Sequence, residues 1–177
     1  DIEWAVKIAE INNKYNIKGC FFVLLSTINY NIFDQKAYRS LKRIVELGQD
    51  IGLHFNTHNK SIDIEVFFEV LRCIVPESLN LVSWHNPSDQ YQKLNNKFKS
   101  NKYLSIYKEP FFYKETYISD SNLRNNPSQI FEKICKMQNL KKTIQLLIHP
   151  LNWITEENKI KQILSKTFKK KIKDINE

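Results

Sequence analysis

Two histidines, His54 and His58, are the residues of this sequence whose type and spacing most directly suggest chemistry. They stand at the end of a short apolar run, residues 50–55, and a spacing of four residues lets one helical turn or a tight loop aim both imidazoles at one point. Such a pair can hold a metal ion. Taken alone it is weak evidence, because accidental or structural pairs of this spacing are at least as common.

The other two of the four histidines, His85 and His149, also follow apolar runs that we expect to be strands, and Asp120 follows another such run. The carboxyl ends of parallel strands meet at one sheet edge or barrel mouth, where α/β enzymes carry their catalytic groups. Two imidazoles and a carboxylate around an open fourth position make a catalytic zinc-type site. The combination therefore favours a metal site over an accidental pair.

The candidate acids are Asp1, Glu3 and Asp120, and each also has a simpler interpretation. Asp1 and Glu3 would reach the histidines if a further strand precedes Asp1, but they fit equally well as first-turn acids that complement a helix dipole. Asp120 also fits a turn or an N-cap. His149 is harder to explain without a role, because an imidazole at the end of a buried strand needs a hydrogen-bond partner.

Apolar runs and helical patterns alternate along the chain, and Gly48 and Pro76 are placed as helix stops, with Asp34 as an N-cap. The alternation predicts an α/β fold with mainly parallel strands, in a sheet that is open or closed into a distorted (β/α) barrel. We expect one domain over residues 1–177, lacking its first strand in this chain. The expected helices cover residues 1–14, 34–47, 61–75, 127–137 and 155–174, and the expected strands cover residues 18–25, 50–55, 79–84, 103–107, 116–119 and 143–148.

The composition excludes a disordered chain, since 42% of the 177 residues are hydrophobic and 12% are aromatic. The net charge of +8 is concentrated in lysines of the last expected helix. We favour a solvated helix face there and expect no nucleic-acid partner. Contact with nucleic acid or an anionic membrane is the alternative.

The three cysteines, Cys20, Cys73 and Cys135, share no CxxC spacing, and each lies in an apolar run. This pattern predicts reduced, buried thiols and a cytoplasmic setting. No run approaches the roughly 18 apolar residues of a membrane helix. We therefore expect no transmembrane segment, and no signal peptide is recognisable.

Five segments, taken in order, resemble the motifs of the polysaccharide deacetylases of the NodB-homology type, in the shorter branch associated with bacterial surface-polysaccharide loci. They extend over nearly the whole chain, and five motifs in the right order are fairly specific. The segments are Asp1-x-Glu3, Gly52-Leu53-His54-x-x-x-His58, Trp84-His85-Asn86-Pro87-Ser88, Tyr117-Ile118-Ser119-Asp120-Ser121, and Leu147-Ile148-His149-Pro150 with Trp153 after it.

The resemblance implies a distorted (β/α) barrel that holds a divalent metal, most often zinc, through a carboxylate and two histidines. The implied metal ligands are Glu3, His54 and His58. Asp1 would be the general base, although Asp1 and Glu3 could exchange roles. His149 would protonate the leaving amine, and Asp120 would orient His149 or hold it charged.

The activity implied is removal of an acetyl group from an N-acetylated sugar in surface-polysaccharide biosynthesis. The implied substrate-binding residues are Trp84, His85, Asn86, Arg124 and Trp153. For the two tryptophans, packing at the barrel mouth is the favoured interpretation and stacking on a sugar ring is the alternative. Two other function classes stay open: a metal-dependent hydrolase of another C–N bond, such as a cyclic amide or imide, and a non-catalytic relic with a basic binding helix.

Overall fold

The computed structural model describes residues 2–27, 30–56, 63–85, 91–122, 127–137 and 143–154. Its α-helices are α1 (Ile2–Lys14), α2 (Gln35–Glu46), α3 (Ile64–Ile74), α4 (Tyr91–Lys97), α5 (Pro127–Met137) and α6 (Leu151–Ile154). Its strands are β1 (Cys20–Val23), β2 (Asp50–Phe55), β3 (Leu81–Trp84), β4 (Leu104–Ser105), β5 (Tyr117–Ser119) and β6 (Gln145–Leu147). Two short 3₁₀ helices, η1 (Lys114–Thr116) and η2 (Asp120–Asn122), flank β5.

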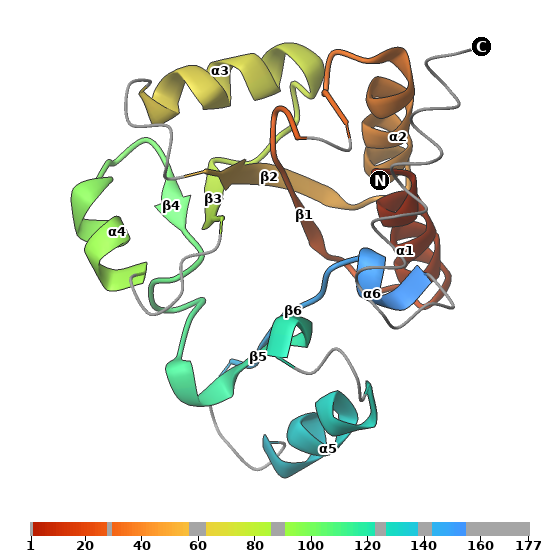
Figure 1. Ribbon diagram of the computed structural model, residues 1–177, viewed down its shortest axis with the longest axis vertical. Helices are drawn as coiled ribbons and strands as arrows, with labels where there is room; N and C mark the ends of the chain where they lie inside the picture. Colours follow the sequence, from red (N-terminus) through yellow and green to blue (C-terminus); the bar gives the residue numbers. More distant parts are fainter. Residues whose placement is uncertain are drawn as a thin grey trace.

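Two parallel sheets form the framework. The larger has the strand order β1-β2-β3-β4, and the smaller pairs β5 with β6. A helix connects the two members of each pair, as Figure 1 shows, because parallel neighbours need a crossover connection. The mixed α/β class expected from the sequence is confirmed. Within the described residues no strand pair joins the two sheets, so closure into a barrel is not shown.

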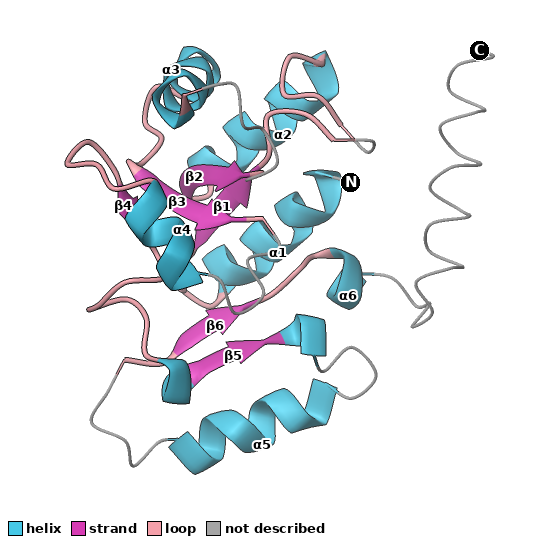
Figure 2. Ribbon diagram, turned by 60° about the vertical axis from the view of Figure 1, so that its left-hand side comes forward, coloured by secondary structure: helices cyan, strands magenta, loops and turns pink. Residues whose placement is uncertain are grey.

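The apolar core centres on β2, whose inward residues Ile51, Leu53 and Phe55 are at most 1% exposed. Both α2 and α3 contact this strand, and α1 lies alongside α2 (Figure 1). The helix α5 contacts β5 on the side turned away from the larger sheet (Figure 2). The large apolar residues of β2 therefore alternate along the strand, and Asp50, Gly52 and His54 lie on its other face.

Several local signals in the sequence act as expected. The ranges of β2 and α5 are those predicted, and Gly48 ends the α2 region with a positive φ of 76°. Asp34 stands at the N-cap of α2 with extended backbone, but its side chain makes no capping hydrogen bond there. Asp63, which the pattern did not single out, caps α3 by accepting a hydrogen bond from the Glu65 N–H at 3.0 Å.

The structure differs from the expected elements mainly at their ends. The apolar run of residues 18–25 is a strand only over Cys20–Val23, because beyond Val23 the Leu24 N–H donates to the Tyr30 hydroxyl at 3.1 Å and the Leu25 carbonyl accepts from the Ile32 N–H at 3.0 Å. The helix α4 was not expected, since its seven residues, YQKLNNK, carry no apolar periodicity. The expected helix over residues 155–174 lies outside the described residues.

The expectation that all three thiols are buried is wrong. Cys73 and Cys135 are exposed because they lie on the outer faces of α3 and α5, whereas Cys20 is partly buried, and burial raises the pKa of its thiol to about 12. All three are free thiols, as expected. Among the described helices, none combines the length and the apolarity that crossing a bilayer requires.

Gly52 provides a test of how tightly β2 is packed. A Cβ at this position would lie 2.7 Å from the Phe22 ring and 3.1 Å from the Leu81 carbonyl oxygen. We predict that Gly52→Ala lowers the free energy of unfolding by about 1–3 kcal/mol, because the added methyl group overpacks the sheet. Urea denaturation at neutral pH measures the change.

Gly48→Asn is the matched control. No heavy atom lies within 4 Å of a Cβ at Gly48, and asparagine tolerates its positive φ, so this variant should change stability much less. A Gly52→Ala protein as stable as the wild type would contradict the packing that the structure shows.

Candidate active site

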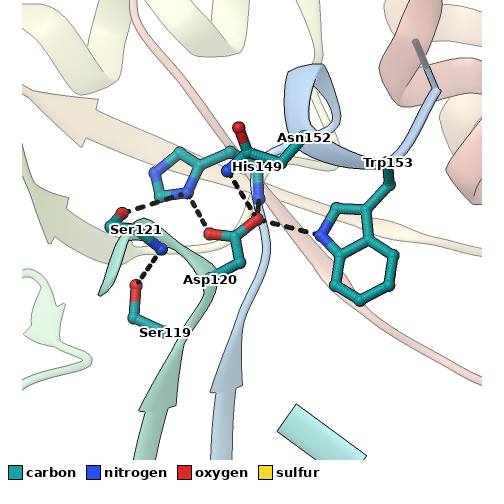
Figure 3. Close-up of polar contacts among 6 residues, drawn as sticks. All are labelled: Ser119, Asp120, Ser121, His149, Asn152 and Trp153. Carbon is teal, nitrogen blue, oxygen red and sulfur yellow. Dashed lines mark hydrogen bonds and ion pairs between the residues drawn. The ribbon is translucent and has the colours of Figure 1, made fainter. Parts of the chain in front are cut away.

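Asp120 is the one carboxylate that is buried in the described part of the chain, with 1% of its surface exposed. Its Oδ1 accepts a hydrogen bond from Nδ1 of the His149 ring at 2.6 Å. Its Oδ2 accepts three more, from the backbone N–H of His149 at 2.7 Å, from Nδ2 of Asn152 at 3.0 Å and from Nε1 of Trp153 at 2.9 Å. Figure 3 shows these donors gathered around the carboxylate.

Strand register and a short turn assemble this cluster. The last residues of β5 and β6, Ser119 and Leu147, pair with each other, so the residues that follow both strands emerge at the same edge. After β6 the chain turns into α6, where the N–H of Asn152 donates to the His149 carbonyl at 2.9 Å. That turn brings the side chains of α6 back over the carboxylate.

The hydrogen bonds determine the charge of Asp120. Burial raises the pKa of this carboxyl, but the contacts with His149 and Asn152 favour the ionised form and outweigh burial, so the pKa lies below its ordinary value. An ionised Asp120 keeps a proton on Nδ1 of His149 and leaves Nε2 of that ring free to exchange one. The His149 side chain is 44% exposed, so the pair is an accessible acid–base group held by a buried carboxylate.

A second pair of side chains, His54 and His85, meets at the ends of β2 and β3. Nε2 of His54 lies 3.1 Å from Nδ1 of His85, and the ring centroids are 5.1 Å apart. His54 is paired in register with Ser83, and His85 follows Ser83 by two residues, so both imidazoles are on the same face of the sheet. The contact is therefore a diagonal neighbour pair of a parallel sheet.

The environment keeps the His54 ring uncharged. Burial first, and the electrostatic effects of His85 and His149 second, lower its pKa to about 4, although the contact of Nδ1 with the Ser83 carbonyl oxygen at 3.1 Å opposes them. An uncharged imidazole is the form that binds a metal ion.

The expected metal ligands are not assembled by the described residues. Glu3 lies in the first turn of α1, where its half-exposed carboxylate pairs with Nζ of Lys36 at 3.0 Å. Among the described residues no group of three or more His, Cys, Asp or Glu side chains is placed to hold a metal ion. Asp1 and His58 lie outside the described residues, so the ligand assignment stays a prediction.

The two tryptophans have different surroundings. Trp84 is 1% exposed, donates from Nε1 to Oδ1 of Asn95 at 2.9 Å, and packs against Phe55 and Phe98. It belongs to the core, which agrees with the favoured packing interpretation and leaves its ring no face for a sugar. Trp153 is 39% exposed and uses its indole N–H on Asp120, so a substrate contact through its ring stays a prediction.

Among the other residues expected to bind substrate, His85 contacts the His54 ring. Asn86 and Arg124 lie outside the described residues. A pocket of about 540 Å³ opens between α4 and residues 107–115, and the described histidines do not line it. The candidate site is therefore defined by the contacts of its side chains and not by that pocket.

Sequence reasoning missed the supporting roles of Ser83 and Asn152. The sequence did carry a signal for the Asn152 contact. Asn152 follows His149 by three residues, about one helical turn, so both side chains can reach the same carboxylate. The Ser83 contact had none, because it depends on the register between β2 and β3.

Comparisons with protein-family models, with curated proteins and with solved structures find no match. The fold defines a mixed α/β protein with parallel strands, and any function must be argued from the site itself.

Replacing Asp120 with asparagine tests the buried carboxylate. We predict that Asp120→Asn lowers the free energy of unfolding at pH 7 by about 2–3 kcal/mol, because an amide turns a donor toward groups that need an acceptor. The pKa in the folded state lies below the ordinary value of 3.8, so the stabilisation is present above that pH and is lost as the pH falls through the folded pKa. Urea denaturation at several pH values should show the difference between variant and wild type shrinking below about pH 4.

Asp34→Asn is the control for a carboxylate on the surface. Its side chain is exposed and makes no capping hydrogen bond in α2, so its effect should be small at every pH. A difference between Asp120→Asn and wild type that does not vary with pH would contradict the charged, buried state of Asp120.

Proposed function

We propose that this protein is a metal-dependent hydrolase that removes the acetyl group from an N-acetylated sugar, in the cytoplasm and in the biosynthesis of a surface polysaccharide. We infer that its two sheets belong to one distorted (β/α) barrel, with the histidines at the mouth. The observation that carries the proposal is the bond between the buried Asp120 carboxylate and Nδ1 of His149 at 2.6 Å. The order of the sequence motifs supports the substrate class.

The Asp120–His149 pair suits an acid that protonates a leaving group. Such an acid needs a fixed orientation, a fixed tautomer and one accessible ring nitrogen. The buried carboxylate supplies the first two through Nδ1 and the backbone N–H of His149, and the exposed side of the ring supplies the third. The carboxylate also stabilises the imidazolium form, as in other carboxylate–histidine pairs.

The reaction proposed is amide hydrolysis. A water molecule adds to the acetyl carbonyl carbon and gives a proton to the general base, for which Asp1 is the candidate. The C–N bond then breaks, and the amine nitrogen takes a proton from Nε2 of His149, so the products are acetate and the free amino sugar. Asp120 remains ionised throughout and holds the ring in place.

The donor chemistry of His54 fits a metal ligand. The Ser83 carbonyl can only accept, so Nδ1 of His54 carries the proton and Nε2 carries the lone pair, which is the usual arrangement of a metal-binding histidine. The proposed ligands are Glu3, His54 and His58. A divalent metal, most often zinc, would supply Lewis acidity to the acetyl carbonyl and the attacking water.

Acetate release tests the proposal. The zinc-loaded protein should release acetate from N-acetylglucosamine offered in free, nucleotide-linked or lipid-linked form. His149→Ala should reduce the rate by about 10²–10⁴-fold, the usual contribution of a general acid. Phe131→Ala is the control, because it removes an exposed ring on α5, the helix on the side of β5 turned away from the larger sheet, and it should keep the wild-type rate.

Two results would reject the proposal. One is ring opening of a cyclic imide with no acetate released from any of the three sugars, which would assign the site to another C–N bond. The other is acetate release that His149→Ala leaves unchanged.

A further inference from the structure

The contact between His54 and His85 joins two segments that lie far apart in the sequence. His85 follows β3 and is not one of the metal ligands proposed above. Its Nδ1 nevertheless lies 3.1 Å from Nε2 of His54, the nitrogen that would bind the metal. The N–H of His85 also donates to the Phe55 carbonyl at 2.8 Å, which extends the ladder between β2 and β3 and fixes the backbone that carries the ring.

The separation of the two nitrogens suits neighbouring ligands of one ion. Zinc binds imidazole nitrogen at about 2.0–2.1 Å with tetrahedral angles, which puts two adjacent ligand nitrogens about 3.3 Å apart. The observed 3.1 Å is close to this value. The interplanar angle of 83° is an edge-on arrangement and not a stack, in which the lone pairs of the two rings would lie in parallel planes and not meet.

The tautomers agree with this arrangement. Nδ1 of His54 faces the Ser83 carbonyl and carries a proton, so Nε2 presents its lone pair to His85. Without a metal, His85 must place its own proton on Nδ1 to make this contact a hydrogen bond. If that proton moves to the other ring nitrogen, Nδ1 gains a lone pair and both facing nitrogens become donors to a metal ion.

We propose that His85 is a further metal ligand, which binds through Nδ1 next to Nε2 of His54 at the ends of β2 and β3. This inference rests on the proposed function, since it concerns the same metal. It replaces the substrate-binding role expected for His85. The register between β2 and β3 puts His85 on the same sheet face as His54, and the proposal gives that position a role.

Metal binding by the full chain tests the inference without relying on activity. The metal-free protein is titrated with Zn²⁺ by calorimetry, and with Co²⁺ by visible absorption, which reports the ligand set. His85→Ala should weaken Zn²⁺ binding about 100-fold or more, because even a contact that only supports a ligand is worth about 10–100-fold. His85→Ala should also reduce or shift the Co²⁺ bands.

His85→Asn separates ligation from hydrogen bonding. Asparagine can donate from its amide nitrogen to Nε2 of His54, but zinc sites use Cys, His and carboxylate ligands, and an amide nitrogen is not among them. The inference predicts that this variant keeps the thermal stability of the metal-free protein and still loses Zn²⁺. His149→Ala is the control for loss of a nearby imidazole and should keep wild-type Zn²⁺ affinity.

The outcomes distinguish the two proposals. Wild-type Zn²⁺ affinity in His85→Asn would overturn the inference while leaving a metal-dependent hydrolase in place. A wild-type protein that binds neither ion would overturn the proposed function and the inference with it. Loss of Zn²⁺ in both His85 variants, with wild-type affinity in His149→Ala, supports His85 as a ligand.

Discussion

A carboxylate without contact with solvent is stable only where hydrogen bonds replace the water that it has lost, and this constraint organises the candidate site around Asp120. Its four donors come from a short segment that begins at His149 and ends at Trp153. The same bonds that keep the carboxylate charged therefore fix the orientation of the His149 ring and the turn into α6. The stability of this region and the orientation of the His149 ring depend on the same hydrogen bonds to Asp120, so a substitution of Asp120 should affect both.

The larger sheet contributes a second pair of side chains by a different physical route. Register between β2 and β3 puts His54 opposite Ser83, and the two-residue period of a strand then brings His85 onto the same face. The His54 ring adds no buried charge, because its pKa is lowered to about 4. Each sheet thus supplies one pair of polar groups, assembled by its own strand register.

The parts of the fold that the sequence predicted are those with strong local causes. The inward residues of β2, Ile51, Leu53 and Phe55, are apolar because helices cover that side of the strand, and Gly48 takes a positive φ that other residues resist. Two elements differ from the prediction: α4 lacks a periodic apolar face, and β1 is shorter than its apolar run because the chain after Val23 bonds its own following loop and not β2. Exposure of Cys73 likewise depends on which face of α3 meets the sheet.

By itself the sequence determined the α/β class and the positions of the histidines after strand-forming runs, because apolar periodicity and helix stops are local properties. Only the tertiary structure decided which of these side chains meet. Asp120 bonds His149 because β5 and β6 end in register, and His85 meets His54 because β2 and β3 do. Trp84, beside His85 in sequence, is turned into the core by the alternation of the same strand. Such contacts depend on register and strand order, which residues far apart in the chain determine together.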